Sequence, residues 1–299
     1  MIDFKTLETF VWVANLRSFR GAAEKLHTTQ PAVSMRIAQL EDSLRVHLLE
    51  RDRRRVAPTE KGRELVGYAE RLLRLRAEMI EAVGDPSTMR GLVRLGVAET
   101  IVHTWLPAFI ERVNTAYPNL ELEIEVDISP NLRERLLGRD LDLAFLLGPL
   151  SHPNIHSRPL CAFPLAFMAT PAIRLGKPAV PLAAIARHPL ITYSRNTQPY
   201  MVLRELFARA GLKPTIHASA SLATVVHMAL GGIGIAVLPP AILAAVPTRG
   251  RLRAIKAEVE LPSLDFIVSW ASTPDSFAAQ KVAEIATQVA QGGAAGARR

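Results

Sequence analysis

The first sixty residues carry apolar side chains at helical spacing in three short segments. Each segment follows a residue whose side-chain oxygen can cap a helix, namely Asp3, Ser18 and Thr29. In the third segment Pro31 falls in the first turn, where proline is tolerated, and the pattern ends near Ser43. Three helices with inward faces are therefore predicted, and these faces consist of Leu7, Phe10, Val11 and Ala14, then Ala22, Ala23 and Leu26, then Val33, Ile37 and Leu40.

A basic hairpin and a long helix are predicted next. Residues 50–58 are crowded with arginine and suit a two-stranded wing. Between residues 59 and 83, apolar side chains recur with spacings of 3, 4, 3, 4 and 3, at Leu65, Tyr68, Leu72, Leu75, Met79 and Ala82. This heptad seam predicts a dimerisation helix that pairs with a copy of itself, and the alternative is one face packed on its own domain. Residues 84–87 then form a hinge.

Beyond residue 90 the hydrophobic period changes, and strands alternate with helices. Such alternation predicts βαβ units and a mostly parallel sheet. Ser129 is expected to cap the second of the helices. The predicted strands are 92–97, 122–128, 141–147, 165–169, 190–193, 215–219, 233–238 and 265–271, and the predicted helices are 99–117, 132–137, 201–210, 222–230 and 277–289.

Composition limits the classes of protein that fit this pattern. The chain has 299 residues, of which 49% are hydrophobic, which suggests about two domains with real cores. Its net charge of +8 favours a polyanionic partner, although many basic proteins bind none. Cys161 is the only cysteine, so we expect a buried thiol without a disulfide or zinc site. A secretory signal and a membrane-spanning apolar run are both absent, so we expect a cytoplasmic protein.

The third helix and the hairpin carry the chemistry of DNA recognition. Gln30, Ser34 and Arg36 lie near the start of the third helix, where a recognition helix contacts base edges. Glutamine suits adenine, and arginine suits guanine or phosphate. The wing holds the densest positive cluster in the chain, which would contact phosphates or the minor groove, the alternative being a solvated surface; it comprises Arg51, Arg53, Arg54 and Arg55.

The segment from Ser18 to Ser34 resembles the helix-turn-helix of the LysR-type transcriptional regulators. The resemblance continues through Ile37, Leu40, Glu41, Leu44, Leu48, Arg51, Arg54, Val56, Thr59 and Gly62. It implies that DNA is contacted by Thr29, Gln30, Pro31, Ser34, Met35, Arg36, Arg51, Arg53 and Arg54. Three positions depart from the family pattern: Met35 stands where arginine is frequent, Arg45 where glycine is usual, and Leu49 where phenylalanine is common.

The resemblance covers nearly the whole chain but is looser after residue 90. There it rests on residues 91–96, Ser129, Leu136, Gly138, 141–144 and 231–239. It implies a winged helix-turn-helix (all-α with a β wing) over 1–60, a linker helix and hinge over 61–87, and an α/β effector-binding domain over 88–299. That domain would resemble a periplasmic binding protein, with one subdomain of 91–162 and 267–299 and another of 163–266. The crossovers are expected near 161–164 and 263–266.

The family resemblance also implies the partners. These are double-stranded promoter DNA with inverted-repeat sites, a small-molecule effector, a second or further copies of the chain in a homodimer or homotetramer, and RNA polymerase as a candidate. No membrane partner is expected. We expect no cofactor.

Ligands of open α/β sheets bind beyond the carboxyl ends of the strands, next to helix N-termini. Arg195 follows a buried strand and could clamp a carboxylate, with a surface salt bridge as the alternative. An anionic or polar effector is therefore expected, although Glu99 would repel an anion unless it pairs with Arg195 or the effector carries an amine. The candidate effector-binding residues are Glu99, Thr100, His103, Ser129, Gly148, Pro149, Arg195, Asn196 and Thr197.

Two other classes of protein are alternatives to this interpretation. An enzyme is disfavoured because the sequence lacks a Gly-x-Ser-x-Gly elbow, a phosphate loop and a His-Glu-x-x-His helix. Gly231 to Gly234 precede a predicted strand rather than follow one, so they are a weak dinucleotide signal. A DNA-binding protein that needs no effector remains open, and it would show a steep salt dependence with little sequence preference.

Overall fold

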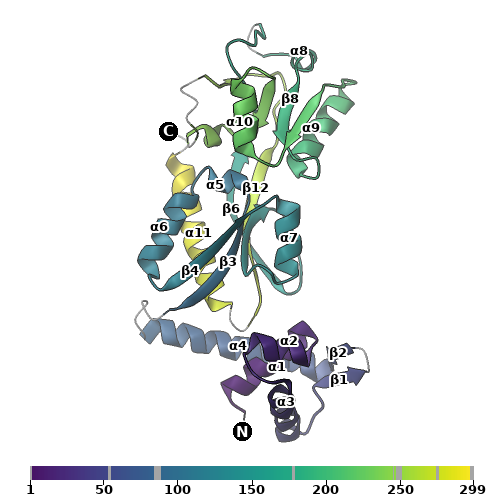
Figure 1. Ribbon diagram of the computed structural model, residues 1–299, viewed down its shortest axis with the longest axis vertical. Helices are drawn as coiled ribbons and strands as arrows, with labels where there is room; N and C mark the ends of the chain where they lie inside the picture. Colours follow the sequence, from purple (N-terminus) through teal and green to yellow (C-terminus); the bar gives the residue numbers. More distant parts are fainter. Residues whose placement is uncertain are drawn as a thin grey trace. The chain divides into compact units, whose positions relative to one another are not determined.

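The computed structural model describes residues 2–52, 55–83, 89–176, 179–244, 246, 251–273 and 276–296 (Figure 1). The chain forms two compact units. The first comprises Met1–Thr88 with Ser272–Ala278, and the second comprises Met89–Ala271 with Ala279–Arg299. None of the helices in the described ranges is long and apolar enough to cross a membrane.

The first unit is a winged helix-turn-helix followed by a long helix. Its elements are α1 (Phe4–Leu16), α2 (Phe19–Lys25), α3 (Gln30–Leu44), β1 (Leu49–Asp52), β2 (Arg55–Pro58) and α4 (Glu60–Val83). The three predicted caps are confirmed, since Asp3, Ser18 and Thr29 each accept the backbone N–H three residues later, at 2.7, 3.0 and 3.4 Å. The wing is confirmed as an antiparallel pair in which Glu50 faces Ala57.

Helix α4 has two different apolar faces. Ala69 and Leu73 are buried in the core that α1, α2 and α3 also form, and Leu65 packs partly against that core. Four further seam side chains face outward, and their exposed fractions are 58% for Tyr68, 47% for Leu72, 61% for Leu75 and 58% for Met79. The side chain of Ala82 lies outside the described residues. The seam is thus largely separate from the face that holds α4 on its own unit.

The second unit contains two five-stranded sheets joined by short connections. The first sheet has the order β4 (Leu120–Val126), β3 (Gly91–Val97), β5 (Leu143–Leu147), β12 (Ser263–Ala271) and β6 (Ile155–Pro164). The second has the order β11 (Arg253–Ile255), β7 (Ala166–Ala169), β10 (Ile235–Leu238), β8 (Leu190–Tyr193) and β9 (Ile216–Ser219). The chain passes to the second sheet between β6 and β7 and returns between β11 and β12.

Helices cover both sheets. They are α5 (Glu99–Val102), α6 (Leu106–Ala116), α7 (Ser129–Leu137), α8 (Leu182–Ile185), α9 (Gln198–Arg209), α10 (Leu222–Leu230), the 3-10 helix η2 (Pro240–Ala244) and α11 (Phe277–Gly296). In Figure 1, α6 and α11 lie on the opposite side of the first sheet from α7, and α9 and α10 cover the second sheet. The α/β architecture with two subdomains is confirmed.

Three details of the prediction are wrong, and the strands β6 and β11 were not predicted. Both sheets are mixed rather than mostly parallel, because β12 pairs antiparallel with β5 and β6, and β7 with β10 and β11. The helix expected over 99–117 is broken into α5 and α6, since Pro107 starts a new helix and cannot continue the earlier one. Ser129 does not cap α7, because its Oγ accepts the Leu147 N–H at 3.0 Å and Ile128 is the cap residue.

Candidate functional site

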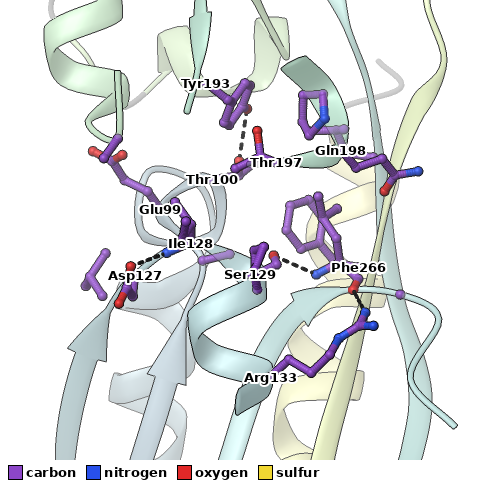
Figure 2. A pocket seen from close by; sticks show the side chains of 18 of the residues that line it. Glu99, Thr100, Asp127, Ile128, Ser129, Arg133, Tyr193, Thr197, Gln198 and Phe266 are labelled. Atoms are coloured by element: carbon purple, nitrogen blue, oxygen red, sulfur yellow. Dashed lines mark hydrogen bonds between the residues drawn. The ribbon is translucent and has the colours of Figure 1, made fainter. Parts of the chain in front are cut away.

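A cavity of about 520 Å³ lies between the two sheets of the second unit (Figure 2). Its lining comprises Ala98, Glu99, Thr100, Val126, Asp127, Ile128, Ser129, Pro130, Arg133, Glu134, Leu147, Gly148, Tyr193, Thr197, Gln198, Pro199, Ala220, Ser221, Leu264 and Phe266. This volume is within the range of small-molecule sites in proteins.

The topology explains why these residues meet. β3 pairs in parallel with β4 and β5, so the segments that follow these three strands lie along one edge of the first sheet. The opposite wall comes from the end of β8, the start of α9 and the segment before α10 in the second sheet. The cavity is therefore placed beyond strand carboxyl ends and beside the N-termini of α7, α9 and α10, as expected for an α/β binding site.

Glu99 links the two sides of the cavity. Its Oε2 accepts the backbone N–H of Leu222, the first residue of α10, at 2.6 Å. Its Oε1 accepts the Ser221 hydroxyl at 3.3 Å and lies 3.4 Å from His103 Nε2. The Glu99 carboxylate thus caps a helix that belongs to the other sheet, and the positive end of α10 favours its negative charge.

A second link joins Thr100 and Tyr193, whose hydroxyl oxygens are 3.1 Å apart (Figure 2). Burial raises the pKa of the Tyr193 phenol well above its ordinary value, so this group stays protonated and neutral. One hydroxyl group donates this hydrogen bond and the other accepts it. The accepting group keeps its own O–H, which could donate to a ligand in the cavity.

Replacing Glu99 with alanine should loosen the first turn of α10. A hydrogen bond to a charged acceptor contributes about 1.5–3 kcal/mol, so amide exchange at Leu222 should accelerate roughly 10- to 100-fold. Hydrogen exchange resolved to single amides measures this. Glu134→Ala is the control, because Glu134 also lines the cavity but lies on α7, which packs on the first sheet. Equal exchange at Leu222 in both variants would mean that Glu99 does not stabilise α10.

Arg133 is the cation of the cavity lining. Its Nη2 donates to the carbonyl oxygens of Pro149 at 2.9 Å and Leu147 at 3.5 Å. No carboxylate in the described part of the chain forms an ion pair with Arg133. The carbonyls orient the guanidinium, and its remaining N–H donors are available to an acidic ligand.

In the first unit, α3 presents an accessible N-terminal end. Gln30, Pro31 and Met35 are exposed and Ser34 is half-buried. Thr29, the cap residue, is also exposed. The described residues exclude Arg53, Arg54 and the side chain of Arg51, so their predicted DNA contacts lie outside them. The half-buried Arg36 donates to Thr9 Oγ1 at 3.4 Å, so part of its side chain holds α3 against α1.

Two family descriptions match this chain. Residues 4–63 match the bacterial regulatory helix-turn-helix protein of the lysR family, and residues 86–291 match the LysR substrate binding domain. The chain belongs to the LysR family. It is a DNA-binding transcription regulator that carries an effector-binding domain, as the sequence predicted.

Similar proteins agree with this membership. The HTH-type transcriptional regulator BbuR of Bordetella bronchiseptica is 32% identical over 241 residues, which cover 79% of this chain and 74% of BbuR. Among solved structures, Corynebacterium glutamicum OxyR in an H2O2-bound form has a TM-score of 0.58 at 24% identity, covering 98% and 94% of the two chains. Full-length CbnR in complex with its target DNA has a TM-score of 0.52 at 19% identity, covering 97% and 100%.

Cys161 is the only cysteine in the sequence of this LysR regulator. Cys161 is half-buried on β6, less enclosed than the sequence suggested. Burial raises the pKa of its thiol to about 11, so little reactive thiolate exists at neutral pH. Its likeness to OxyR is a likeness of fold.

The cavity of this LysR regulator contains some of the predicted effector residues and not others. Glu99, Thr100, Ser129, Gly148 and Thr197 line it. His103 contacts Glu99 beside it, and Pro149 contributes the carbonyl that Arg133 binds.

Arg195 and Asn196, which were expected to contact the effector, do not line this cavity. Both Thr197 N and Thr197 Oγ1 donate to the Ser194 carbonyl, at 3.0 and 2.6 Å, and this tight turn leaves residues 195 and 196 exposed. Arg195 instead lines a separate depression with Arg204 and Lys213. Glu99 pairs with the start of α10 and not with Arg195.

Several lining residues were missed by the sequence analysis. Asp127 and Tyr193 lie at strand ends and Gln198 is the first residue of α9, so the rule that selected Glu99 could have selected them. Arg133 lies within a helix and Phe266 within β12, and their positions depend on strand pairing that the sequence does not reveal.

Proposed function

We propose that this regulator reads inverted-repeat promoter DNA as a homodimer or homotetramer in the cytoplasm, and that a small organic acid bound between its two sheets changes that reading. Residues 1–60 would bind DNA, 61–87 would join two copies, and 88–299 would bind the effector. The observation that carries the effector site is the cavity whose walls come from both sheets and include an arginine with no acidic partner among the described residues. A ligand there contacts both subdomains and can favour one arrangement over another.

Arg133 is the proposed anchor for the acid group. A thermal-shift screen of small carboxylates, aromatic acids and amino acids should raise the unfolding midpoint of the wild type for at least one compound. Arg133→Ala should reduce the affinity for that compound roughly 10- to 100-fold, because a charge-assisted hydrogen bond contributes about 1.5–3 kcal/mol. Arg195→Ala is the matched control and should bind like the wild type. Loss in Arg195→Ala with retention in Arg133→Ala would contradict the assignment.

On DNA, the N-terminal end of α3 is the proposed reading surface, with Thr29, Pro31, Ser34 and Met35 around Gln30 and the wing arginines on the backbone. Gln30→Ala should reduce specific affinity by about 1–3 kcal/mol, the range of a bidentate base contact, and leave non-specific affinity unchanged. Gln39→Ala is the control, because this exposed glutamine lies nine residues later and on the other side of the helix. Fluorescence anisotropy with specific and scrambled DNA measures both. Equal effects of the two substitutions would exclude Gln30 as a reader.

A further inference from the structure

The charged residues of the cavity are distributed unevenly. Glu99 follows β3 and Asp127 follows β4, and these strands pair so that Val97 faces Val126. The two carboxylates therefore belong to neighbouring strand ends, and Figure 2 shows them on one side of the cavity with Arg133 and Gln198 on the other. With Glu134, the described residues of the lining include three carboxylates and a single arginine.

The acidic side of the cavity, formed by Glu99 and Asp127, accepts hydrogen bonds from neutral backbone, amide and hydroxyl donors. Asp127 Oδ1 accepts the Ile128 N–H at 2.7 Å and the Asn131 amide at 3.0 Å, and both donors are neutral. Glu99 is bonded to a backbone N–H and a hydroxyl, and His103 adds a positive charge only when protonated. Within the described ranges, neither Glu99 nor Asp127 forms an ion pair with a lysine or arginine.

Glu99 also occupies the position where α10 would otherwise receive an anion. The Leu222 N–H and the Ser221 hydroxyl, which could bind a ligand carboxylate at a helix N-terminus, are both used by Glu99. An acid group from the effector is thus repelled from this side and attracted to Arg133. The lining also contains apolar side chains, among them Val126, Leu264 and Phe266.

We infer that the effector is a small zwitterion, with an ammonium group toward Asp127 and Glu99, a carboxylate at Arg133 and an apolar body against Phe266. This inference rests on the proposed function and narrows its ligand from organic acids to amino acids and their close relatives. A dicarboxylate would place its second anion against the acidic side, where Glu99 already accepts the Leu222 N–H and the Ser221 hydroxyl.

The test compares compounds that share a carbon skeleton. Isothermal titration of the full-length protein would use the standard amino acids, the acid that each gives on loss of its amine, and the amine that each gives on loss of its carboxylate, with glutarate as a dicarboxylate. The expected result is an amino acid that binds about tenfold or more tighter than both of its partners. If the amine-free acids bind as tightly as the amino acids, the inference of a zwitterion is wrong and the proposed organic-acid site is retained. If no compound binds up to millimolar concentration, both are overturned.

Variants of the acidic side give an independent readout. Asp127→Asn and Glu99→Gln retain an oxygen that accepts the same backbone N–H but remove the charge. Each should reduce the preference for the amino acid over its amine-free acid by about tenfold, whereas a purely structural effect would weaken both compounds alike. Glu134→Gln, a more exposed lining residue, is the control. An unchanged preference in the Asp127→Asn, Glu99→Gln double variant would overturn the inference.

Discussion

Replacing Leu72 and Leu75 together with glutamate should produce a folded monomer that binds an inverted-repeat operator roughly 100- to 10,000-fold more weakly than the wild type. Both side chains are about half-exposed in the isolated chain and lie in one row with Tyr68 and Met79. Charged groups at these heptad positions would face each other across a helix pair and oppose its formation. Loss of the helix pair removes the linkage between two DNA-binding domains, so each half-site must then be bound independently.

The helix itself should remain folded in this double variant. Ala69 and Leu73, which hold α4 on the core of its unit, are untouched. Arg74→Glu is the matched control, because it also changes the net charge by −2 on the exposed surface of α4 and loses only a weak contact of 3.9 Å with Glu78. Sedimentation velocity and anisotropy would be measured for both. A double variant that remains dimeric would exclude this seam as the interface.

The substitution Gly62→Ala should destabilise the first unit by about 3 kcal/mol, at the upper end of the usual range for overpacking. A Cβ at this position would lie 2.1 Å from the carbonyl oxygen of Leu48 and 3.1 Å from Pro58 Cβ. The obstacle is backbone, and the same carbonyl accepts the Thr59 N–H at 3.0 Å, so it cannot move away cheaply. The first turn of α4 therefore packs on the entry to the wing in a way that only glycine permits.

Gly67→Ala provides the control on the same helix. A Cβ there meets no atom within 4 Å, so alanine should be neutral or stabilising by roughly 0.5–1 kcal/mol. Urea titration followed by hydrogen exchange of peptides from α1 to α4 would report on the first unit alone, and peptides from β3 to β5 should keep their midpoint. Similar behaviour of the two alanine variants would show that the close approach at Gly62 is not tight.

Features encoded by neighbouring residues were predictable from the sequence. The caps at Asp3, Ser18 and Thr29 need only a side-chain oxygen three residues before a free N–H. The heptad seam needs only spacing along one helix, and its exposed side chains are visible in the structure. Periodicity alone predicted only alternating strands and helices. The division into two subdomains came from the family resemblance.

Features that depend on long-range pairing were missed or misplaced. Ser129 has the chemistry of a cap, but the neighbouring strand β5 takes its hydroxyl oxygen through the Leu147 N–H. Arg195 follows a buried strand as a clamp should, yet the Ser194–Thr197 turn leaves it exposed away from the cavity lining. Arg133 is found only when α7 is packed against β5, because its carbonyl partners come from the end of that strand and the residues after it.

The central claim is that a ligand bound in the cavity changes how the protein binds its operator DNA. The most direct measurement is an anisotropy and footprint titration of the operator with wild type and Arg133→Ala, each with and without a saturating compound from the thermal-shift screen. The account predicts that the compound alters affinity or protected length for the wild type only, and that DNA alters the affinity for the compound by the same factor. A compound that binds the wild type tightly yet leaves affinity and footprint unchanged would contradict it and favour a regulator that needs no effector.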